Sequence, residues 1–162
     1  MTTEPIHPDV RVGHVHLKVS DLERAVAFYR DVLGFEVMQR YGAQAAFLSA
    51  GGYHHHIGLN TWESRGGRPS PPGHTGLYHA AILYPNRREL ARALQRLMAL
   101  GVPITGASDH GVSEAIYLND PDGNGLELYV DRPRAEWPVV DGELQMHTVP
   151  LDLDRLLATL EP

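Results

Sequence analysis

The chain has 162 residues, of which 43% are hydrophobic and 21% are charged, and these proportions are typical of a folded domain. Its 14 lysines and arginines against 20 aspartates and glutamates give a net charge of −6, which argues against a nucleic-acid partner. No apolar stretch reaches the roughly 18 to 20 residues of a membrane span and no basic and apolar leader opens the chain, so we expect a cytoplasmic protein without a membrane partner.

The first half of the chain predicts a strand, a helix and three further strands. Residues 12–19 alternate between apolar and polar side chains, which is typical of a half-buried strand. Ser20, with Glu23 three residues later, predicts the start of a helix over 21–33 that ends at Gly34. Glycine turns then separate three short segments that predict strands, at 35–41, 45–49 and 54–60.

The second half of the chain repeats this plan. Residues 77–84 predict a strand, and Asn86 with Glu89 predicts the start of a helix that runs to Gly101. Three further strands are predicted at 103–107, 113–119 and 125–131. We therefore expect an α+β fold of two βαβββ modules, whose curved mixed sheets would line one concave cleft if they curl together.

The expected domain organisation follows from the same pattern. We expect a single domain over residues 1–131, followed by a tail over 132–162. The domain divides into a first module at 12–62, a linker at 63–74 and a second module at 75–131. Three prolines and three glycines in the linker disfavour regular packing. The end of the tail, 151–160, predicts a short amphipathic helix that docks on the body or on a second copy of the chain.

The polar faces of the predicted strands carry the candidate functional residues. Because side chains alternate along a strand, the residues opposite the apolar face share one side of each sheet. These residues are His14, His16, His56, His79, Tyr117 and Glu127. The chain has no cysteine, so a metal has to be held by imidazole and carboxylate groups, which suit a divalent first-row metal. Exposed sheet faces are ordinarily polar, so the pattern alone fits either a solvated surface or a metal site.

One segment of the second module resembles a known signature. Its residues, at fixed spacing, are His110, Ile116, Tyr117, Asp120, Pro121, Gly123 and Glu127. This arrangement resembles the signature of type I extradiol ring-cleavage dioxygenases of the catechol 2,3-type, which belong to the vicinal-oxygen-chelate superfamily. The resemblance covers about residues 12–131 and implies paired βαβββ modules around a metal.

The resemblance also implies roles for individual residues. The residues that correspond to the metal ligands of the family are His14, His79 and Glu127. His16 shares the face of His14 and is an alternative first ligand. His56 corresponds to the acid–base residue, and Tyr117 and His110 correspond to groups around the substrate oxygen.

The function that this resemblance implies is Fe(II)-dependent cleavage of a small aromatic diol by dioxygen, with manganese, zinc or nickel as substitutes for iron. Many ring-cleavage enzymes carry an additional pair of modules that this sequence lacks, so we expect a single-pair enzyme. We also expect the enzyme to form a homodimer. Two alternatives are a glyoxalase-like isomerase or lyase and a bleomycin-resistance-type protein that only binds a ligand. Isomerases of the family place a carboxylate on the fourth strand, where this chain has His54 and His56 and no acid before Glu63.

Overall fold

The computed structural model describes residues 4–161 and divides into two units. The first unit contains the described residues up to Arg30 together with Gly34–Gly67. The second unit contains Asp31–Leu33 and the described residues from Arg68 onwards. Each unit has its own sheet and its own helices, and each is described by itself.

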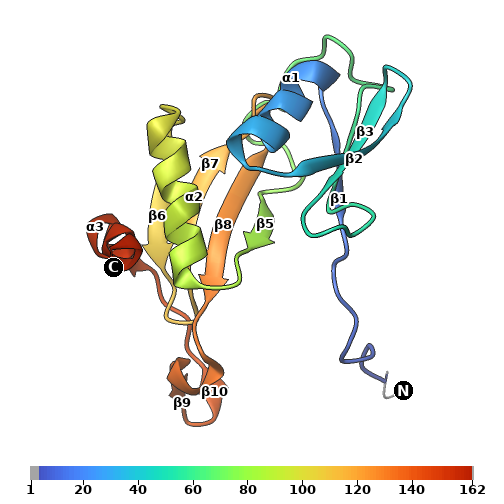
Figure 1. Ribbon diagram of the computed structural model, residues 1–162. Helices are drawn as coiled ribbons and strands as arrows, with labels where there is room; N and C mark the ends of the chain where they lie inside the picture. Colours follow the sequence, from blue (N-terminus) through green and yellow to red (C-terminus); the bar gives the residue numbers. More distant parts are fainter. Residues whose placement is uncertain (1–3, 162) are drawn as a thin grey trace. The chain divides into compact units, whose positions relative to one another are not determined.

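The first unit is a four-stranded sheet covered by a short helical segment (Figure 1). Its elements are β1 (Val15–Lys18), α1 (Leu22–Ala27), η1 (Phe28–Val32), β2 (Glu36–Tyr41), β3 (Ala45–Ser49) and β4 (Ile57–Asn60). The strands lie in the order β1-β4-β3-β2, and only the pair of β1 with β4 is parallel within this sheet. The first strand along the chain, β1, therefore lies beside the last one, β4, and β3 and β2 continue the sheet.

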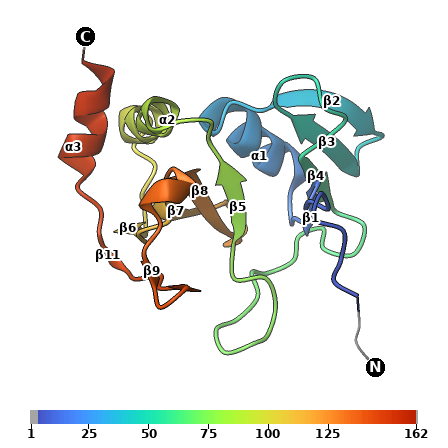
Figure 2. The same cartoon turned by 90° about the horizontal axis from the view of Figure 1, so that it is seen from below.

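The second unit repeats this arrangement with one added strand (Figure 2). Its elements up to residue 131 are β5 (Ala80–Leu83), α2 (Arg87–Ala99), β6 (Gly106–Asp109), β7 (Ser113–Asn119) and β8 (Gly125–Asp131). The strand order is β11-β6-β7-β8-β5, and β5 runs parallel to β8 as β1 does to β4. The shared strand order confirms the predicted α+β class built from two βαβββ modules.

The ends of the two main helices follow from their capping residues. Asp21 caps α1, because its carboxylate accepts a hydrogen bond from the backbone of Arg24. The prediction of Ser20 as the cap was wrong: the Ser20 hydroxyl instead accepts from the Arg24 guanidinium. A π-helical turn then continues the helix to Gly34, which has a positive φ of 88°. The predicted cap of α2 is confirmed, since the Asn86 side chain accepts from the backbone of Glu89.

The alternation that predicted the strands of the second unit is visible in their burial. Leu126, Leu128 and Val130 of β8 are buried, and Glu127 lies on the opposite face. The strand predicted at 103–107 is instead β6 (Gly106–Asp109). The predicted strand starts too early because the prediction relied on the apolar residues before β6. The neighbouring strands β11 and β7 both pair with β6 as far as Asp109.

A core lies between helix and sheet in each unit. The large side chains that are fully buried in the first unit are Val19, Tyr29, Leu48 and Leu59. Those of the second unit are Leu90, Leu94, Leu97, Ile116, Leu118, Leu126, Leu128 and Leu156. Burial of a leucine of this kind contributes about 1.5 to 3 kcal/mol, so these side chains stabilise the sheets that carry the candidate site.

The tail is part of the second unit. Its elements are η2 (Arg134–Glu136), β9 (Val139–Val140), β10 (Glu143–Leu144), β11 (Val149–Pro150), α3 (Leu153–Leu157) and η3 (Ala158–Leu160). The short strand β11 pairs antiparallel with β6, and α3 packs beside α2 with Leu156 fully buried. The predicted helix near the end of the chain is confirmed, and it docks on the body of its own chain.

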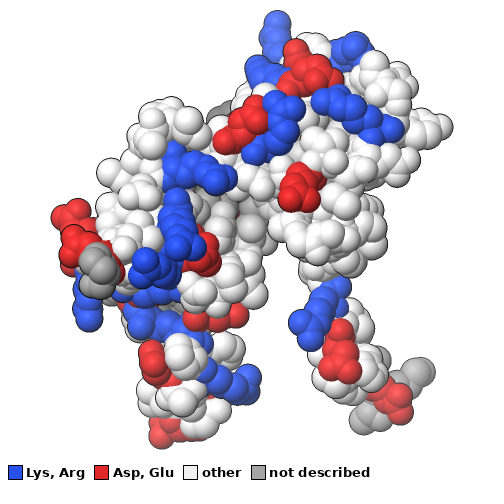
Figure 3. All heavy atoms as spheres, viewed as in Figure 1, with Lys and Arg blue, Asp and Glu red and all other residues white. Residues whose placement is uncertain are grey.

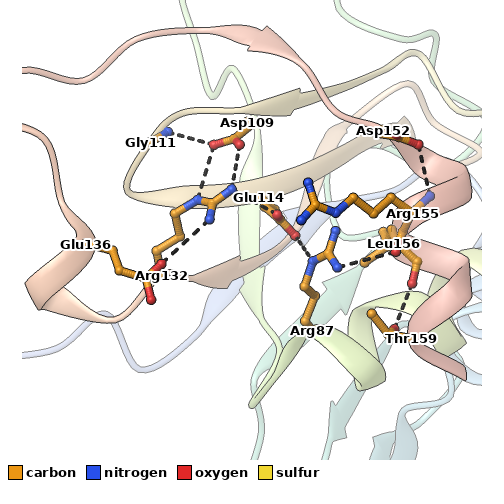
Figure 4. A network of polar contacts seen from close by, with 10 residues as sticks. All are labelled: Arg87, Asp109, Gly111, Glu114, Arg132, Glu136, Asp152, Arg155, Leu156 and Thr159. Atoms are coloured by element: carbon orange, nitrogen blue, oxygen red, sulfur yellow. Dashed lines mark hydrogen bonds and ion pairs between the residues drawn. The ribbon is translucent and has the colours of Figure 1, made fainter.

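A network of charged side chains fixes the tail to the sheet (Figure 4). The carboxylate of Glu114, only 7% exposed, accepts hydrogen bonds from both Arg87 and Arg132. Arg132 also binds Asp109 at 2.6 Å, and Arg87 donates to the backbone carbonyl of Arg155 in α3. The network links β6, β7, α2 and α3. Each of its buried charges has a partner of opposite sign, so no buried ion is left unpaired.

Basic side chains gather over α2 in Figure 3. The arginines of this helix are Arg87, Arg88, Arg92 and Arg96. Arg88 donates to the carbonyls of Thr159 and Leu160, where the final turns of the tail leave backbone oxygens free to accept.

Among residues 4–161, no helix has the length and the apolar composition of a membrane span.

Candidate metal centre

Three side chains of the second unit meet on one face of its sheet. Tyr117 in β7 and Glu127 in β8 are direct partners in the antiparallel ladder, so their side chains point to the same side. His79 lies one residue before β5, the parallel neighbour of β8. Nε2 of His79 is 2.9 Å from Oε2 of Glu127, and the Tyr117 hydroxyl donates to Oε1 of the same carboxylate at 3.1 Å. The carboxylate thus joins an imidazole and a phenol.

His110 extends this arrangement by one more contact. Its Nε2 is 2.7 Å from the Tyr117 hydroxyl. Burial and, after it, the adjacent Glu127 carboxylate together raise the pKa of Tyr117 to about 12. Tyr117 therefore keeps its proton at neutral pH, and it can donate that proton in a hydrogen bond.

A cavity of about 610 Å³ lies against these residues in the second unit. His79, His110 and Tyr117 line it together with apolar groups that include Leu77 and Leu118. Protein pockets for small organic ligands usually have volumes of roughly 300 to 1,000 Å³ and combine apolar walls with a few polar groups. The cavity has the size and the lining of such a pocket.

The first unit gathers a different set of imidazoles. The ring of His14, just before β1, lies 4.3 Å from the ring of His55, and Nδ1 of His55 is 2.7 Å from Nδ1 of His54. Partial burial lowers the pKa of His55, and the neighbouring imidazoles, His14 first, lower it further. His55 is therefore a neutral imidazole that can accept a proton.

His56 has different neighbours. Its Nδ1 is 3.0 Å from the hydroxyl of Ser49 and 3.3 Å from the backbone nitrogen of Ala50, and its ring stacks on Tyr53. Strand parity predicted that His56 shares a face with His14, but the ring that contacts His14 is that of His55. Strict alternation does not extend to the histidine run, because the run precedes β4, which starts only at Ile57. The acid–base role of His56 stays a prediction.

His16 lies on the sheet of the first unit among aromatic side chains. Its ring is 5.8 Å from that of Phe47 and 5.7 Å from that of Trp62. It also lies over Gly58, where an added Cβ would approach the ring to 2.8 Å. Burial lowers the pKa of His16, as does the neighbouring His14. The packing of His16 has a structural role of its own, which leaves His14 as the less enclosed of the two candidate ligands.

The comparisons with known proteins identify the family. The family model of the "Glyoxalase/Bleomycin resistance protein/Dioxygenase superfamily" matches residues 11–128. The chain belongs to this superfamily. The match includes His14, His79 and Glu127, and the tail from residue 132 onwards lies beyond it.

This superfamily member is similar to two curated relatives and to one solved structure. The chain is 44% identical over 153 residues to a catechol-2,3-dioxygenase of Bacillus subtilis, a match that covers 94% of this chain and 53% of the relative. It is 31% identical over 121 residues to biphenyl-2,3-diol 1,2-dioxygenase 3 of Rhodococcus globerulus, covering 75% and 63%. The chain therefore spans about half to two thirds of the length of these curated relatives. A lactoylglutathione lyase of Agrobacterium tumefaciens, at 27% identity, has a TM-score of 0.59 and covers 76% of this chain and 96% of its own.

The donor atoms of the second unit of this superfamily member fit a first-row metal. Nε2 of His79 and Oε2 of Glu127 are 2.9 Å apart, so one metal would be within reach of both donor atoms. Nδ1 of His79 is buried without a hydrogen-bond partner, so the orientation of this ring is set through Nε2. Among the described residues, no three histidines or acidic residues form a complete cation site. The predicted triad takes His14 from the other unit and stays a prediction.

Proposed function

We propose that the protein is an extradiol dioxygenase that uses a divalent metal and dioxygen to cleave a catecholic ring next to its two hydroxyls. The observation that carries the proposal is the contact of His79 and Glu127, which places an imidazole nitrogen and a carboxylate oxygen at the spacing of two metal ligands. The dioxygenases among the relatives of this chain support the same reaction class.

The proposed ligands are His14, His79 and Glu127, and the proposed metal is Fe(II), with manganese, zinc or nickel as possible substitutes. Two imidazoles and one carboxylate leave coordination positions open, and the bound metal would supply a common site for the diol and dioxygen. The protein supplies part of the orientation of these ligands, since the Tyr117 hydroxyl donates to Oε1 of Glu127, the oxygen that does not face His79.

Tyr117 and His110 are proposed to act on the substrate oxygens. Tyr117 stays protonated at neutral pH, so its hydroxyl, which donates to Glu127 before substrate binds, can turn to donate its one proton to an oxygen of the diol in the adjoining cavity. His110 is bound to the same hydroxyl and can hold its orientation. Both groups line the cavity of about 610 Å³, whose volume suits an aromatic ring with a substituent.

Proton transfer is proposed for the histidine run before β4. The sequence assigns it to His56, whereas the contacts favour His55, which lies against His14 and has a lowered pKa. A neutral imidazole can accept a proton from a hydroxyl and return it later in the reaction. Matched variants of the two residues distinguish the assignments.

The test of the proposed function is reconstitution of the chain with Fe(II) without oxygen, followed by catechol and then air. A yellow ring-opened product that forms only after air is admitted is the expected result. Parallel samples with Mn(II), Zn(II) and Ni(II) identify the metal. Turnover of catechol or of a glutathione adduct without oxygen would indicate an isomerase instead, and stoichiometric binding without product would indicate a binding protein. Either outcome would overturn the proposal.

We also propose that two copies of the chain form a homodimer through the tail. Large apolar side chains of its hairpin and of the segment that follows are about half exposed, and they are Val139, Val140, Leu144, Met146 and Val149. Exposed apolar side chains that lie close together are typical of association surfaces. Light scattering should give the mass of a dimer for the chain and of a monomer for a variant with Val139→Ser and Val140→Ser. A monomeric unmodified chain would refute this proposal.

A further inference from the structure

The tail contributes contacts to His110, a residue of the candidate site. Nδ1 of His110 is 3.1 Å from the hydroxyl of Thr148 and 3.2 Å from the backbone carbonyl of His147. Both residues directly precede β11, and both lie outside residues 11–128, which the family model matches. No functional role follows for Thr148 from the sequence signature.

The hydrogen bonds around Tyr117 determine which nitrogen of His110 carries the proton. The Tyr117 hydroxyl donates to Glu127, whose carboxylate can only accept. The Tyr117 oxygen must therefore accept from His110, so Nε2 of His110 carries a proton. In a neutral imidazole, Nδ1 then has a free lone pair and needs a donor. Thr148 has a hydroxyl that can donate, whereas the His147 carbonyl cannot.

We propose that Thr148 is a positioning residue that fixes the tautomer of His110, and through it the hydroxyl of Tyr117 that faces the substrate. The part of this proposal that concerns catalysis rests on the proposed function, and the part that concerns the tautomer of His110 does not. Without the Thr148 hydroxyl, the lone pair of Nδ1 would face the His147 carbonyl oxygen, an unfavourable contact of two acceptors. A proton on Nδ1 removes this repulsion, since Nδ1–H can donate to the carbonyl.

The backbone around Thr148 is held in place by the turn between β6 and β7. Gly111 in this turn has a φ of 75°, and a Cβ added to it would lie 2.4 Å from Cε1 of His147. The absence of a side chain at Gly111 thus makes room for the His147 ring. The backbone nitrogen of His147 also donates to the His110 carbonyl, and Val149 pairs with Asp109 in the sheet. The hydrogen-bonded backbone on both sides of Thr148 therefore holds this residue beside His110.

The direct test is nitrogen NMR of the His110 imidazole at neutral pH in the full chain, with its signals assigned by their loss in His110→Gln. The unmodified chain should show a protonated Nε2 and an unprotonated Nδ1. Thr148→Val keeps the shape of the side chain but removes the hydroxyl, and it should place a proton on Nδ1. Thr148→Ser, which keeps a hydroxyl, should restore the original pattern. An unchanged His110 spectrum in the valine variant overturns the proposal, as does a serine variant that behaves like valine.

The second readout is the steady-state rate of ring cleavage. Thr148→Val should lower kcat by about tenfold, the scale of one hydrogen bond, and change KM by less than about twofold. Thr159→Val is the matched control, because the Thr159 hydroxyl binds the Leu156 carbonyl elsewhere in the tail, and it should leave kcat unchanged. Equal losses in both variants would indicate a purely structural role. If the unmodified chain cleaves no ring, the proposed function fails, and the NMR result still decides the role of Thr148.

Discussion

Nε2 of His79, one residue before β5, and Oε2 of Glu127, on the parallel neighbouring strand β8, lie 2.9 Å apart. Because strands of a sheet are about 4.8 Å apart, side chains from adjacent strands meet at this distance without distortion of the backbone. The two donor atoms are therefore already close together before any ligand binds.

This contact predicts that metal binding depends on Glu127. Glu127→Ala should lower the affinity for Fe(II) by at least about a hundredfold, since Glu127 is proposed as a direct ligand rather than a supporting group. Metal content after anaerobic purification and titration of the metal-free protein measure the effect. Glu143→Ala, which removes an exposed carboxylate of β10, is the matched control and should bind metal like the unmodified chain. Equal affinities of the two variants would remove Glu127 from the metal site.

The two neighbouring histidines of the first unit should differ in their effects on turnover. His55→Ala should lower kcat by roughly 10² to 10³ with the metal retained, which is the usual contribution of general acid–base catalysis. His56→Ala should cost less than about tenfold in kcat, but it should lower the free energy of unfolding by about 1 kcal/mol, because the buried Ser49 hydroxyl loses one of its two hydrogen-bond partners. Steady-state kinetics and urea unfolding of both variants provide the test. The reverse order of kcat losses would support His56.

The sequence predicted side-chain directions well inside strands and poorly beside them. Tyr117 and Glu127 lie within β7 and β8, where strict alternation holds, and they share a face as predicted. His55 and His56 lie before β4, so the conformation of the turn sets the direction of their rings. The run of three histidines indicated a polar cluster, but it carried no information on which ring reaches His14.

The contacts of the tail were beyond the reach of sequence patterns. The end of the chain had a recognisable helical pattern, and a helix forms there. The pairing of Val149 with Asp109 depends on the exposed edge of β6, which no local pattern of the tail encodes. For the same reason, the role inferred for Thr148 became visible only from its contact with His110.

The hydroxyl of Tyr117 should matter for turnover and little for folding. Tyr117→Phe keeps the ring that packs beside His79 but removes the contacts to His110 and Glu127. We expect kcat to fall by roughly 10²-fold, the lower range for loss of a group that stabilises charge in the transition state. The melting temperature should change by only a few degrees, since the aromatic packing is retained. An unchanged kcat with native metal content would exclude Tyr117 from the reaction.

Asp109 should make the stability of the second unit depend on pH. Partial burial raises the pKa of Asp109, but hydrogen bonds from Arg132 and from the backbone of Gly111 outweigh it, so the pKa lies below its usual range. A carboxylate with a lowered folded-state pKa stabilises the protein above its unfolded pKa of about 3.9, and this contribution is lost as the pH falls through the folded value. Asp109→Asn should therefore cost about 1 to 2 kcal/mol at neutral pH and little at low pH.

Glu23 offers a matched control for this prediction. An arginine, Arg40, also lowers the pKa of Glu23 by a hydrogen bond, but the Glu23 side chain is 71% exposed. Solvent screens such a pair, so Glu23→Gln should change the free energy of unfolding by less than about 0.5 kcal/mol. In urea, the fluorescence of Trp137, whose indole donates to the Arg132 carbonyl, follows unfolding of the second unit with Trp62→Phe as background, and Trp62 follows the first unit, which contains Glu23, with Trp137→Phe as background. Because both carboxylates bind an arginine, similar losses at the two sites would show that burial of the Asp109 network contributes nothing to stability.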